Sequence, residues 1–506
     1  MSHIHHRVTI QILIWGLLGV WATTLARAQE PSNRDILLLG ARNAWKLHAY
    51  DRAIARYGLA ITHDPEQWDA VAELGWLFLD IGHPLEAIHQ FEAATTLAPN
   101  NLSLWRTTAM AYSWTSDYDA ALDTYQTILE RFPTNTTVQL EYNGKEALWR
   151  GHIRQATTAL EQLATLEPHN SDILFDLGQL ATRNDRPFDA HTHYRQLLSL
   201  LPEHRQARLA LDLSTLSQRP LLTLGYTYIN QHGFDNTRSI TYGLASIEER
   251  LRLSDALSTS YAYDNTHFTF GSTAHTITGR WRYNPTRWLH LDGFISGLHY
   301  NGRERDHING GIGLSYETLS GIQLGIDFER KDVWENRTTV LNGIAMNRVS
   351  THVGGTLGRH LDWTLRGDVT NYSDHNTRLG GEFLTSYQVL WFPRTLRLIY
   401  RVNAYGFQRA SSYFSPGAYA TNTAAIEFQH WLGYPTHKDH LAEAPRNHYT
   451  VYYGVSVDSN AKLFHEWHGT LSYPLTQRLD MVPSLKIIRS SVYHEWNTGI
   501  FMRLTF

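Results

Sequence analysis

The chain of 506 residues contains no cysteine, which excludes disulfide bonds and thiolate metal sites. Long apolar runs are also scarce: beyond residue 28, no stretch of about 18 apolar residues could cross a bilayer as a helix. A Gly-x-Ser-x-Gly nucleophile elbow, a phosphate-binding loop and a dinucleotide fingerprint are absent too. We therefore expect a protein that is not an enzyme, with no cofactor, no resident metal and no nucleic-acid partner.

The one long apolar run lies at the N-terminus. Arg7 precedes the run at residues 8–25, and Ala26-Arg27-Ala28 places small residues at the two positions that a signal peptidase reads. This pattern predicts a secretory signal peptide over residues 1–28, cleaved between Ala28 and Gln29. No cysteine follows the run, so a lipoprotein anchor is excluded. A secreted chain that lacks a spanning helix can enter a membrane only as a β-barrel.

The first half of the chain has a helical repeat pattern. Between residues 35 and 217, prolines recur at intervals of 34, 34, 35 and 34 residues, at Pro65, Pro99, Pro133, Pro168 and Pro202. That period is typical of the tetratricopeptide repeat, a helix–turn–helix unit. Small residues at the family positions would let the paired helices approach closely: Gly75, Ala87, Ala121, Gly178 and Ala190. We predict an α-solenoid of about five repeats within residues 29–218, closed by a capping helix over residues 203–217.

The ligand of this solenoid is left open by its composition. Residues 29–220 hold about 24 acidic and about 16 basic side chains. One interpretation is a solvated acidic surface, and the other is a preference for a basic partner or a cationic polymer.

The periodicity changes from helical to two at Pro220. Residues 219–506 accommodate about 16 antiparallel strands at about 18 residues per strand and turn, as in a transmembrane β-barrel. Short turns are predicted at residues 253–256, 284–287, 318–321, 392–395 and 474–477. Longer loops are predicted at residues 232–238, 264–272, 334–346 and 408–417, with one long connection at 434–447 on the side of the short turns. This alternation places the solenoid and the start of the first strand on the periplasmic side.

Alternation within the strands separates an apolar face from a charged face. In the last strand Ile500, Met502, Leu504 and Phe506 share one face and Arg503 lies on the other. An arginine at the lipid midplane costs about 2–4 kcal/mol, so the charged faces must point into the lumen. The pore-lining candidates are Arg280, Arg282, Trp288, Asp292, Phe294, Asp327, Glu329, Arg366, Asp368, Arg397, Arg401, Tyr405 and Arg503. Both signs are present in similar number, so no strong ion selectivity is expected. For each residue, packing or charge pairing within the lumen is the alternative role.

A signal peptide, a tetratricopeptide solenoid and a barrel of about 16 strands together resemble the outer-membrane exopolysaccharide export porins. These are the type that belongs to cellulose synthase and the type that exports poly-β-1,6-N-acetylglucosamine. Tyr413-Phe414-Ser415-Pro416, followed by Tyr419, resembles an outer-loop element of the cellulose type. The terminal Phe506 resembles the signal that outer-membrane barrels present to their assembly machinery. The chain departs from those families in its number of repeats, since it has about five where they carry many more.

The resemblance implies a porin-like protein in the cell outer membrane, with its repeat domain in the periplasm. Its implied partners are outer-membrane lipid, the barrel assembly machinery, a polysaccharide cargo, and periplasmic or inner-membrane synthesis proteins recruited by the repeats. The polymer, the state of the lumen and the oligomeric state are left open.

Two other functions stay open. A barrel plugged by residues 334–346 or another loop would indicate a scaffold or receptor, and a lumen or loop enzyme acting on lipid or glycan is the third possibility. A metal site at His437 and His440 is a minor alternative to two solvated histidines. His465 and His468 are one residue short of the metalloprotease spacing, and on a strand they point to opposite faces.

Overall fold

The computed structural model describes residues 33–506 apart from 116, 302–305, 359, 391–393, 433–446 and 477. The predicted signal peptide with its cleavage site at Ala28 and Gln29, the loop histidines His437 and His440, and nearly all of the 434–447 connection lie outside these residues. Among the described residues, no helix is both long enough and apolar enough to cross a membrane. The chain forms two compact units, residues up to Thr134 and Asn135–Phe506.

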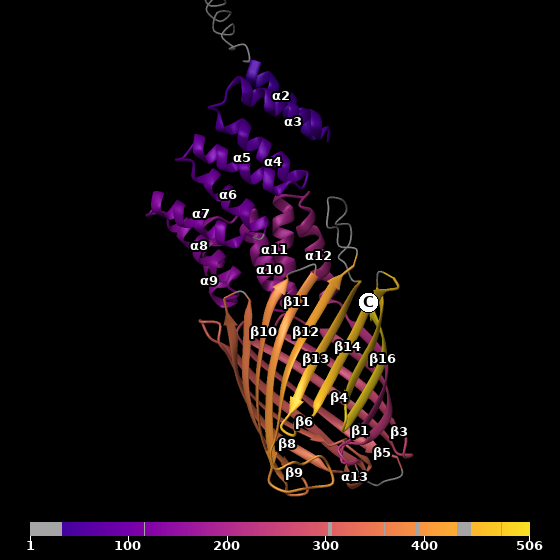
Figure 1. Ribbon diagram of the computed structural model, residues 1–506. Coiled ribbons are helices and arrows are strands. Elements are labelled where there is room, and N and C mark those ends of the chain that lie inside the picture. Colours follow the sequence, from indigo (N-terminus) through magenta and orange to yellow (C-terminus); the bar gives the residue numbers. More distant parts are fainter. Residues whose placement is uncertain are drawn as a thin grey trace, which may run out of the picture. The chain divides into compact units, whose positions relative to one another are not determined.

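The first unit contains three antiparallel helix pairs (Figure 1). These are α2 (Asn33–Lys46) with α3 (Tyr50–His63), α4 (Trp68–Asp80) with α5 (Pro84–Leu97), and α6 (Leu102–Trp114) with α7 (Tyr118–Arg131). Gly75 on α4 makes close pairing possible, because a Cβ atom there would lie 2.8 Å from the ring of Phe91 on α5. Ala87 and Ala121 are fully buried, as expected for the small residues of the repeat.

The second unit begins with two further helix pairs and a single helix. These are α8 (Thr136–Trp149) with α9 (Ile153–Leu166), α10 (Ser171–Arg183) with α11 (Pro187–Leu200), and α12 (Arg205–Gln218). Gly178 on α10 lies against the ring of Tyr194 on α11, and Ala190 is fully buried. Five pairs and a final helix agree with the predicted fold class. The helices end at Gln218 and the first strand begins at Leu221, while a domain boundary at 218/219 stays a prediction.

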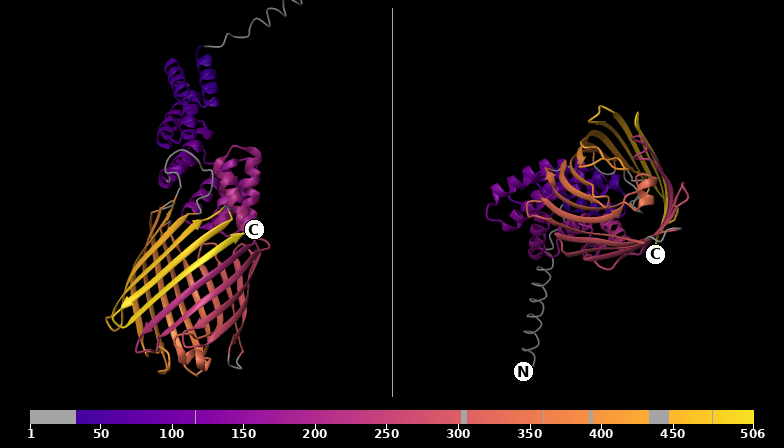
Figure 2. Two further views of the ribbon diagram at one scale, coloured as in Figure 1. Left: turned by 90° about the vertical axis from the view of Figure 1, so that its right-hand side faces the viewer. Right: turned by 90° about the horizontal axis from the view of Figure 1, so that it is seen from below.

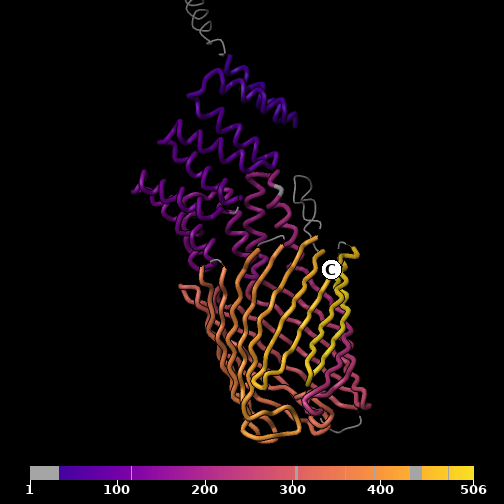
Figure 3. Tube along the Cα trace, in the orientation of Figure 1, coloured from indigo at the N-terminus to yellow at the C-terminus, as the bar shows by residue number. Residues whose placement is uncertain are grey.

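Sixteen antiparallel strands then form a closed barrel in which β1 pairs with β16, and Figure 3 follows their path. Closure leaves no free edge strand to pair with another chain. The strands are β1 (Leu221–Gly233), β2 (Ile240–Arg252), β3 (Leu257–Phe268), β4 (Thr273–Thr286), β5 (Leu289–Tyr300), β6 (Asp306–Glu317), β7 (Gln323–Asp332), β8 (Ala345–Leu357), β9 (Leu361–Tyr372), β10 (Thr377–Leu390), β11 (Arg394–Phe407), β12 (Tyr419–Trp431), β13 (His448–Asp458), β14 (Leu463–Pro474), β15 (Leu479–Ser490) and β16 (Tyr493–Thr505). A short helix, α13 (Arg337–Asn342), lies between β7 and β8.

One predicted loop is wrong. The segment 264–272 was expected to be a long loop, but β3 continues to Phe268 and only residues 269–272 connect it to β4. Thr266 and Phe268 are fully buried on one side of β3. A strand whose inward face is polar has the composition of a loop, which explains the error.

The outward face of the barrel is an apolar band. Large apolar side chains that are exposed alternate along the strands with polar ones, for example Leu324, Ile326 and Phe328 on β7 and Leu398 and Tyr400 on β11. On β16, Ile500 is exposed in the same way, and Phe506 follows the strand. Such a band is what a membrane barrel presents to lipid.

The barrel is contacted by α9, by the connection between α10 and α11 and by the first turn of α11. These contacts lie at the end of the barrel where several short turns lie, which we call the helix end (Figure 2, left). The backbone N–H groups of Phe188 and Asp189, in the first turn of α11, donate to the carboxylate of Asp255 in the β2–β3 turn, at 2.9 and 2.8 Å. Burial raises the pKa of Asp255 even though both amides stabilise its charged form. The side chain of a barrel turn thus caps a helix of the solenoid.

Arginines reinforce this contact. Arg252 donates to the backbone and side-chain oxygens of Asp185 at 2.8 and 2.7 Å. Arg287, in the β4–β5 turn, pairs with Glu161 of α9 and lies 3.5 Å from Asp189. Part of the acidic excess of the helices therefore meets basic residues of the barrel's own rim.

Replacing Asp255 by alanine is expected to detach the start of α11 from the rim. Two charge-assisted hydrogen bonds are lost, at a cost of about 1–3 kcal/mol. Hydrogen exchange of the backbone amides of Phe188 and Asp189 should accelerate by about tenfold or more, while the exchange of β2 and β3 stays unchanged. Asp212→Ala, at an exposed position of α12, is the control. Unchanged exchange at α11 in the Asp255 variant would contradict the cap.

Candidate functional site

Three connections meet at the opposite end of the barrel, which we call the loop end. They are residues 234–239 between β1 and β2, 333–344 between β7 and β8, and 408–418 between β11 and β12. Figure 2 (right) shows α13 lying within the ring of strands when the barrel is seen from this end. The mouth of the lumen is therefore built by these loops.

Asn336 joins all three connections. Its side-chain Nδ2 donates to the carbonyl oxygens of Thr237 and Ser412, at 2.8 and 2.6 Å. Its Oδ1 accepts from the backbone N–H of Thr339 at 3.0 Å, and the Thr339 hydroxyl bonds back, which makes a capping box at the start of α13. Asn336 is only 5% exposed, so water has little access to these groups and could not easily replace their hydrogen-bond partners.

Aromatic side chains fill the space between the loops. Phe414 stacks on Phe234 with ring centroids 4.1 Å apart, and Phe234 lies 5.3 Å from the ring of Tyr493 on β16. Tyr413 is 1% exposed, stacks on Tyr372 at 4.9 Å and donates to Asp374 at 3.2 Å. The 413–416 motif is thus packed into the mouth.

Helix α13 is held against the barrel wall by a second cluster. Trp334 packs edge-on to Phe268 at 5.2 Å, and its indole N–H donates to the hydroxyl of Tyr300 at 2.9 Å. Val340 of α13 is buried in the same cluster, with Ile240 and Leu298. The 333–344 connection is therefore fixed both to the other loops and to the wall.

A cavity of about 350 Å³ lies inside the mouth, bounded by the loops and by strands of the lumen wall. Its lining combines aromatic rings with charged and hydroxyl side chains. The rings belong to Phe234, Tyr372, Tyr405, Phe407, Phe414, Tyr419, Phe464 and Tyr493, and the charged groups to Arg238, Glu335, Arg378, Glu382, Arg401 and Glu466.

Most of these charges have partners within the wall. Arg378 donates to Asp368 at 2.8 Å and lies over the ring of Tyr405 at 5.3 Å. Arg401 on β11 lies 3.5 Å from Glu466 on β14, which His468 also contacts at 2.7 Å. Since β11 and β14 are not neighbours in the sheet, this pair reaches along the concave inner face. Partnered charges of both signs leave no strong field of one sign.

Glu335 is the titratable group at the centre of the loops. Its carboxylate lies 3.9 Å from Arg238 and accepts from the backbone N–H of Phe414 at 3.4 Å. Burial raises the pKa of Glu335 above its ordinary value, and neither Arg238 nor Arg378 offsets that cost. The closed arrangement of loops thus favours the protonated carboxyl.

Register places nearly all predicted lumen residues on the strand face opposite the apolar band. Several have partners there: Arg280 pairs with Glu248 at 3.6 Å, Glu329 with Arg348 at 2.6 Å, and Arg397 with Glu427. The others on this face are Arg282, Asp292, Phe294, Asp327, Arg366, Asp368, Arg401, Tyr405 and Arg503. Whether these residues line a conducting pore stays a prediction.

Trp288 differs from the prediction. It lies in the β4–β5 turn, with the guanidinium of Arg154 5.4 Å from its ring centroid. The predicted turn at residues 284–287 begins too early, because β4 continues to Thr286 through a register shift after Tyr283. The ring of Trp288 is therefore part of the contact with α9 at the helix end, and it does not lie on the lumen face of a strand.

Sequence reasoning missed Asn336, Glu335, Arg238 and Phe234. A signal for the first exists, because asparagine is a preferred N-cap residue where a helix begins. The meeting of three loops has no local signal. In the described residues, no group of three or more His, Asp or Glu side chains could hold a metal ion.

One protein-family model matches the first part of the helical region. Residues 38–101 and 72–136 match the tetratricopeptide repeat family model. No curated protein sequence matches the chain.

Several solved structures are similar to parts of it. A bacterial polysaccharide outer membrane secretin is 12% identical over 57% of this chain and 99% of its own, with a TM-score of 0.45. An anion-selective porin from Comamonas acidovorans is 9% identical over 57% of this chain and 98% of its own, with a TM-score of 0.30. A tetratricopeptide protein of Thermus thermophilus is 20% identical over 36% of this chain and 99% of its own, also at 0.30. The chain joins tetratricopeptide repeats to a closed barrel of sixteen strands, the architecture that its sequence predicts.

Proposed function

We propose that this protein is an outer-membrane export porin for a secreted polysaccharide. The observation that carries the proposal is the cavity inside the mouth, whose lining combines aromatic rings with charged and hydroxyl side chains. A glycan has apolar sugar faces and a hydroxyl rim, so rings stack on the faces while polar groups exchange hydrogen bonds with the rim. Each contact is weak, as passage requires, because a tight site would stall the polymer.

The orientation follows from the same proposal. The helix end, with α8 to α12, lies in the periplasm, and the loop end faces the cell exterior. The repeats recruit or guide the enzymes that synthesise the polymer, the apolar band contacts outer-membrane lipid, and Phe506 is read by the barrel assembly machinery. In this orientation the loops held by Asn336 close the exit when no polymer is present.

Single-channel recording of the refolded full-length barrel tests the proposal. We expect a small resting conductance with brief openings, and a block of the open current when soluble oligomers of a β-glucan or of N-acetylglucosamine are added on the helix side. An open current that no oligosaccharide of either kind blocks would contradict polysaccharide passage.

A scaffold or receptor is the second candidate, because residues 333–344 lie inside the mouth as a plug would. The cavity beneath them favours a gate over a permanent plug. A variant in which residues 334–343 are replaced by a short Gly-Ser linker separates the two. A gate predicts a large, glycan-blocked current, and a scaffold predicts a barrel that stays closed or conducts without glycan sensitivity.

The raised pKa of Glu335 gives the closed mouth a defined pH dependence. In an open, solvated loop the carboxyl has its ordinary pKa near 4.5, and in the closed loop its pKa is higher. Protonation of Glu335 therefore stabilises the closed mouth. This stabilisation is fully present at low pH and is lost as pH rises through the pKa of the closed state. Open probability should therefore increase from acid to neutral pH. Glu335→Gln should stay closed across that range, and a pH response that persists in this variant would contradict the assignment.

A further inference from the structure

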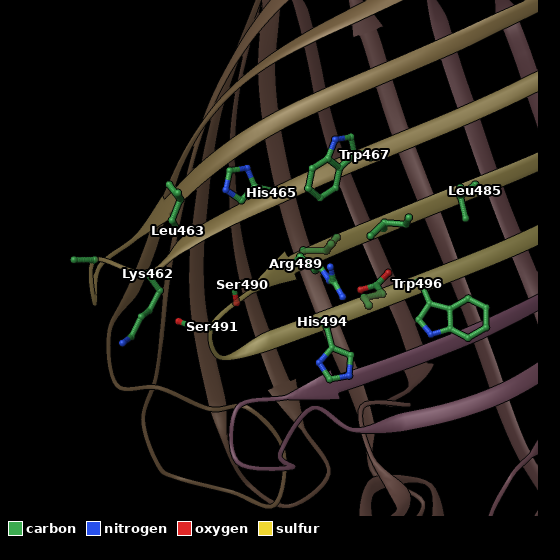
Figure 4. Close-up of a pocket in the computed structure, with 14 residues that line it drawn as sticks. Lys462, Leu463, His465, Trp467, Leu485, Arg489, Ser490, Ser491, His494 and Trp496 are labelled. Atoms are coloured by element: carbon green, nitrogen blue, oxygen red, sulfur yellow. The ribbon is translucent and has the colours of Figure 1, made fainter.

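An unbroken row of basic and imidazole side chains crosses four neighbouring strands on the outer surface of the barrel. In the sheet register His465 on β14 opposes Arg489 on β15, Arg489 opposes His494 on β16, and His494 opposes His232 on β1. The row lies beside the β15–β16 turn, at the loop end (Figure 4). All four positions alternate with inward residues such as Glu466 and Glu495, so the row is on the lipid-facing side.

Directly beneath this row, toward the middle of the barrel, lies an apolar row. Trp467 opposes Ile487, and Ile487 opposes Trp496. Trp467 is 39% and Trp496 41% exposed, and both line one surface pocket with Arg489, His465 and His494 (Figure 4). Tryptophans at this level are typical of the belt where a barrel meets the membrane interface.

No acidic side chain neutralises this row within the described residues. Glu495 is the one acidic residue that lines the pocket, and its carboxylate accepts from Lys486, Tyr493 and Asn497. His465 has a neutral partner, the hydroxyl of Tyr453 at 2.9 Å, and His232 bonds to the hydroxyl of Ser239. Arg489 and His494 are both exposed. The pocket thus offers positive charge above and apolar rings below.

We propose that this surface binds a phosphorylated glycolipid of the outer leaflet, with its phosphate on Arg489 and His494 and its acyl chains over Trp467, Ile487 and Trp496. The inference rests on the proposed orientation, which places the loop end in the outer leaflet. Arginine binds phosphate through paired N–H donors, and a lipid-facing arginine costs much less near the interface than at the bilayer midplane. A bound phosphate offsets that cost, and the apolar row matches the chains that continue from the headgroup.

Lipid retention by the purified full-length protein tests the site. Wild type and an Arg489→Gln/His494→Gln variant are reconstituted in nanodiscs of neutral phospholipid that contain lipid A with two phosphates or dephosphorylated lipid A, and bound lipid A is quantified by mass spectrometry. Wild type should retain the phosphorylated form by about fivefold or more over the dephosphorylated form, and the variant should lose that preference. Arg489→Lys should keep part of it.

Arg330→Gln is the matched control, because Arg330 is an exposed arginine of the outward face on β7 whose guanidinium bonds to Asn347 at 3.1 Å. It should retain lipid A as wild type does. The heat-dependent gel mobility of a folded barrel confirms that each variant is assembled.

Three results would overturn the site. The first is equal retention of phosphorylated lipid A by wild type and the double variant, and the second is retention of an anionic phospholipid by wild type that equals its retention of phosphorylated lipid A. The third is displacement of the bound lipid A by millimolar inorganic phosphate alone. The current recordings are independent of these results, so failure of the lipid site and failure of the export proposal are distinguishable.

Discussion

Replacing Asn336 by alanine is expected to open the mouth of the barrel and to raise its open probability by about tenfold or more. The change removes the two hydrogen bonds to the carbonyls of Thr237 and Ser412 and the side-chain cap of α13. Leaving buried carbonyls without a donor costs about 1–3 kcal/mol, and loss of the helix cap adds about 1 kcal/mol. Each 1.4 kcal/mol shifts an equilibrium by about tenfold.

Single-channel recording in planar bilayers measures this effect directly. Asn460→Ala is the control, because Asn460 lies in another turn of the loop end, is exposed, and donates from its backbone N–H to Asp458 at 2.9 Å, a bond that the substitution keeps. The control should record as wild type does. If Asn336→Ala also retained the resting conductance, the three loops would not be held by this side chain.

The largest effect on folding is expected from the ion pair of Lys145 and Asp176. Lys145 on α8 and Asp176 on α10 pair directly, and each residue is 8% exposed. Burial lowers the pKa of Lys145, but the carboxylate of Asp176, together with Glu141 and Asp172, more than offsets burial and leaves the pKa above its usual value. Lys145→Met removes the cation that pairs with the buried carboxylate of Asp176, which costs about 3–5 kcal/mol. Urea unfolding of the helices, followed by circular dichroism, should give a free energy of unfolding that is lower by that amount, with a midpoint at lower urea concentration.

Two further variants test whether the unpaired charge causes this loss of stability. The double variant Lys145→Met/Asp176→Leu removes both charges and should recover most of the stability, because paired buried charges contribute little over apolar residues of similar size. Arg150→Ala breaks an exposed pair with Glu146 on α8 and should cost less than about 1 kcal/mol. A double variant as unstable as the single one would indicate that the packing of Lys145 matters more than its charge.

Features that repeat in the sequence were predictable, and features made by distant segments were not. The proline interval and the positions of Gly75 and Gly178 predict the helix pairs. The two helices of a pair are adjacent in the sequence, so the small residues that let them approach closely recur at fixed positions. The alternation along β7 and β11 likewise separates lipid from lumen, since every strand repeats the same pattern. These regularities were enough to predict both halves of the fold.

The mouth of the barrel could not be predicted in this way. Tyr413 and Phe414 stood out as a motif, yet their partners Tyr372 and Phe234 come from other parts of the chain. The segment 264–272 misled because polar inward residues of β3 have the composition of a loop. Trp288 misled for a related reason: an aromatic next to a strand was assigned to the lumen, whereas Arg154 from α9 covers it at the rim.

The measurement that tests the central claim most directly is transport of a labelled linear glycan through the purified protein in liposomes. Fluorescent β-linked oligosaccharides are enclosed, and their release is compared for wild type, Asn336→Ala and Asn460→Ala, with a branched dextran of equal mass as the size control. The account predicts slow release through wild type and Asn460→Ala, and release through Asn336→Ala that is much faster for the linear glycan than for dextran. Equal release of both sugars, or none through the opened variant, would contradict a polysaccharide conduit.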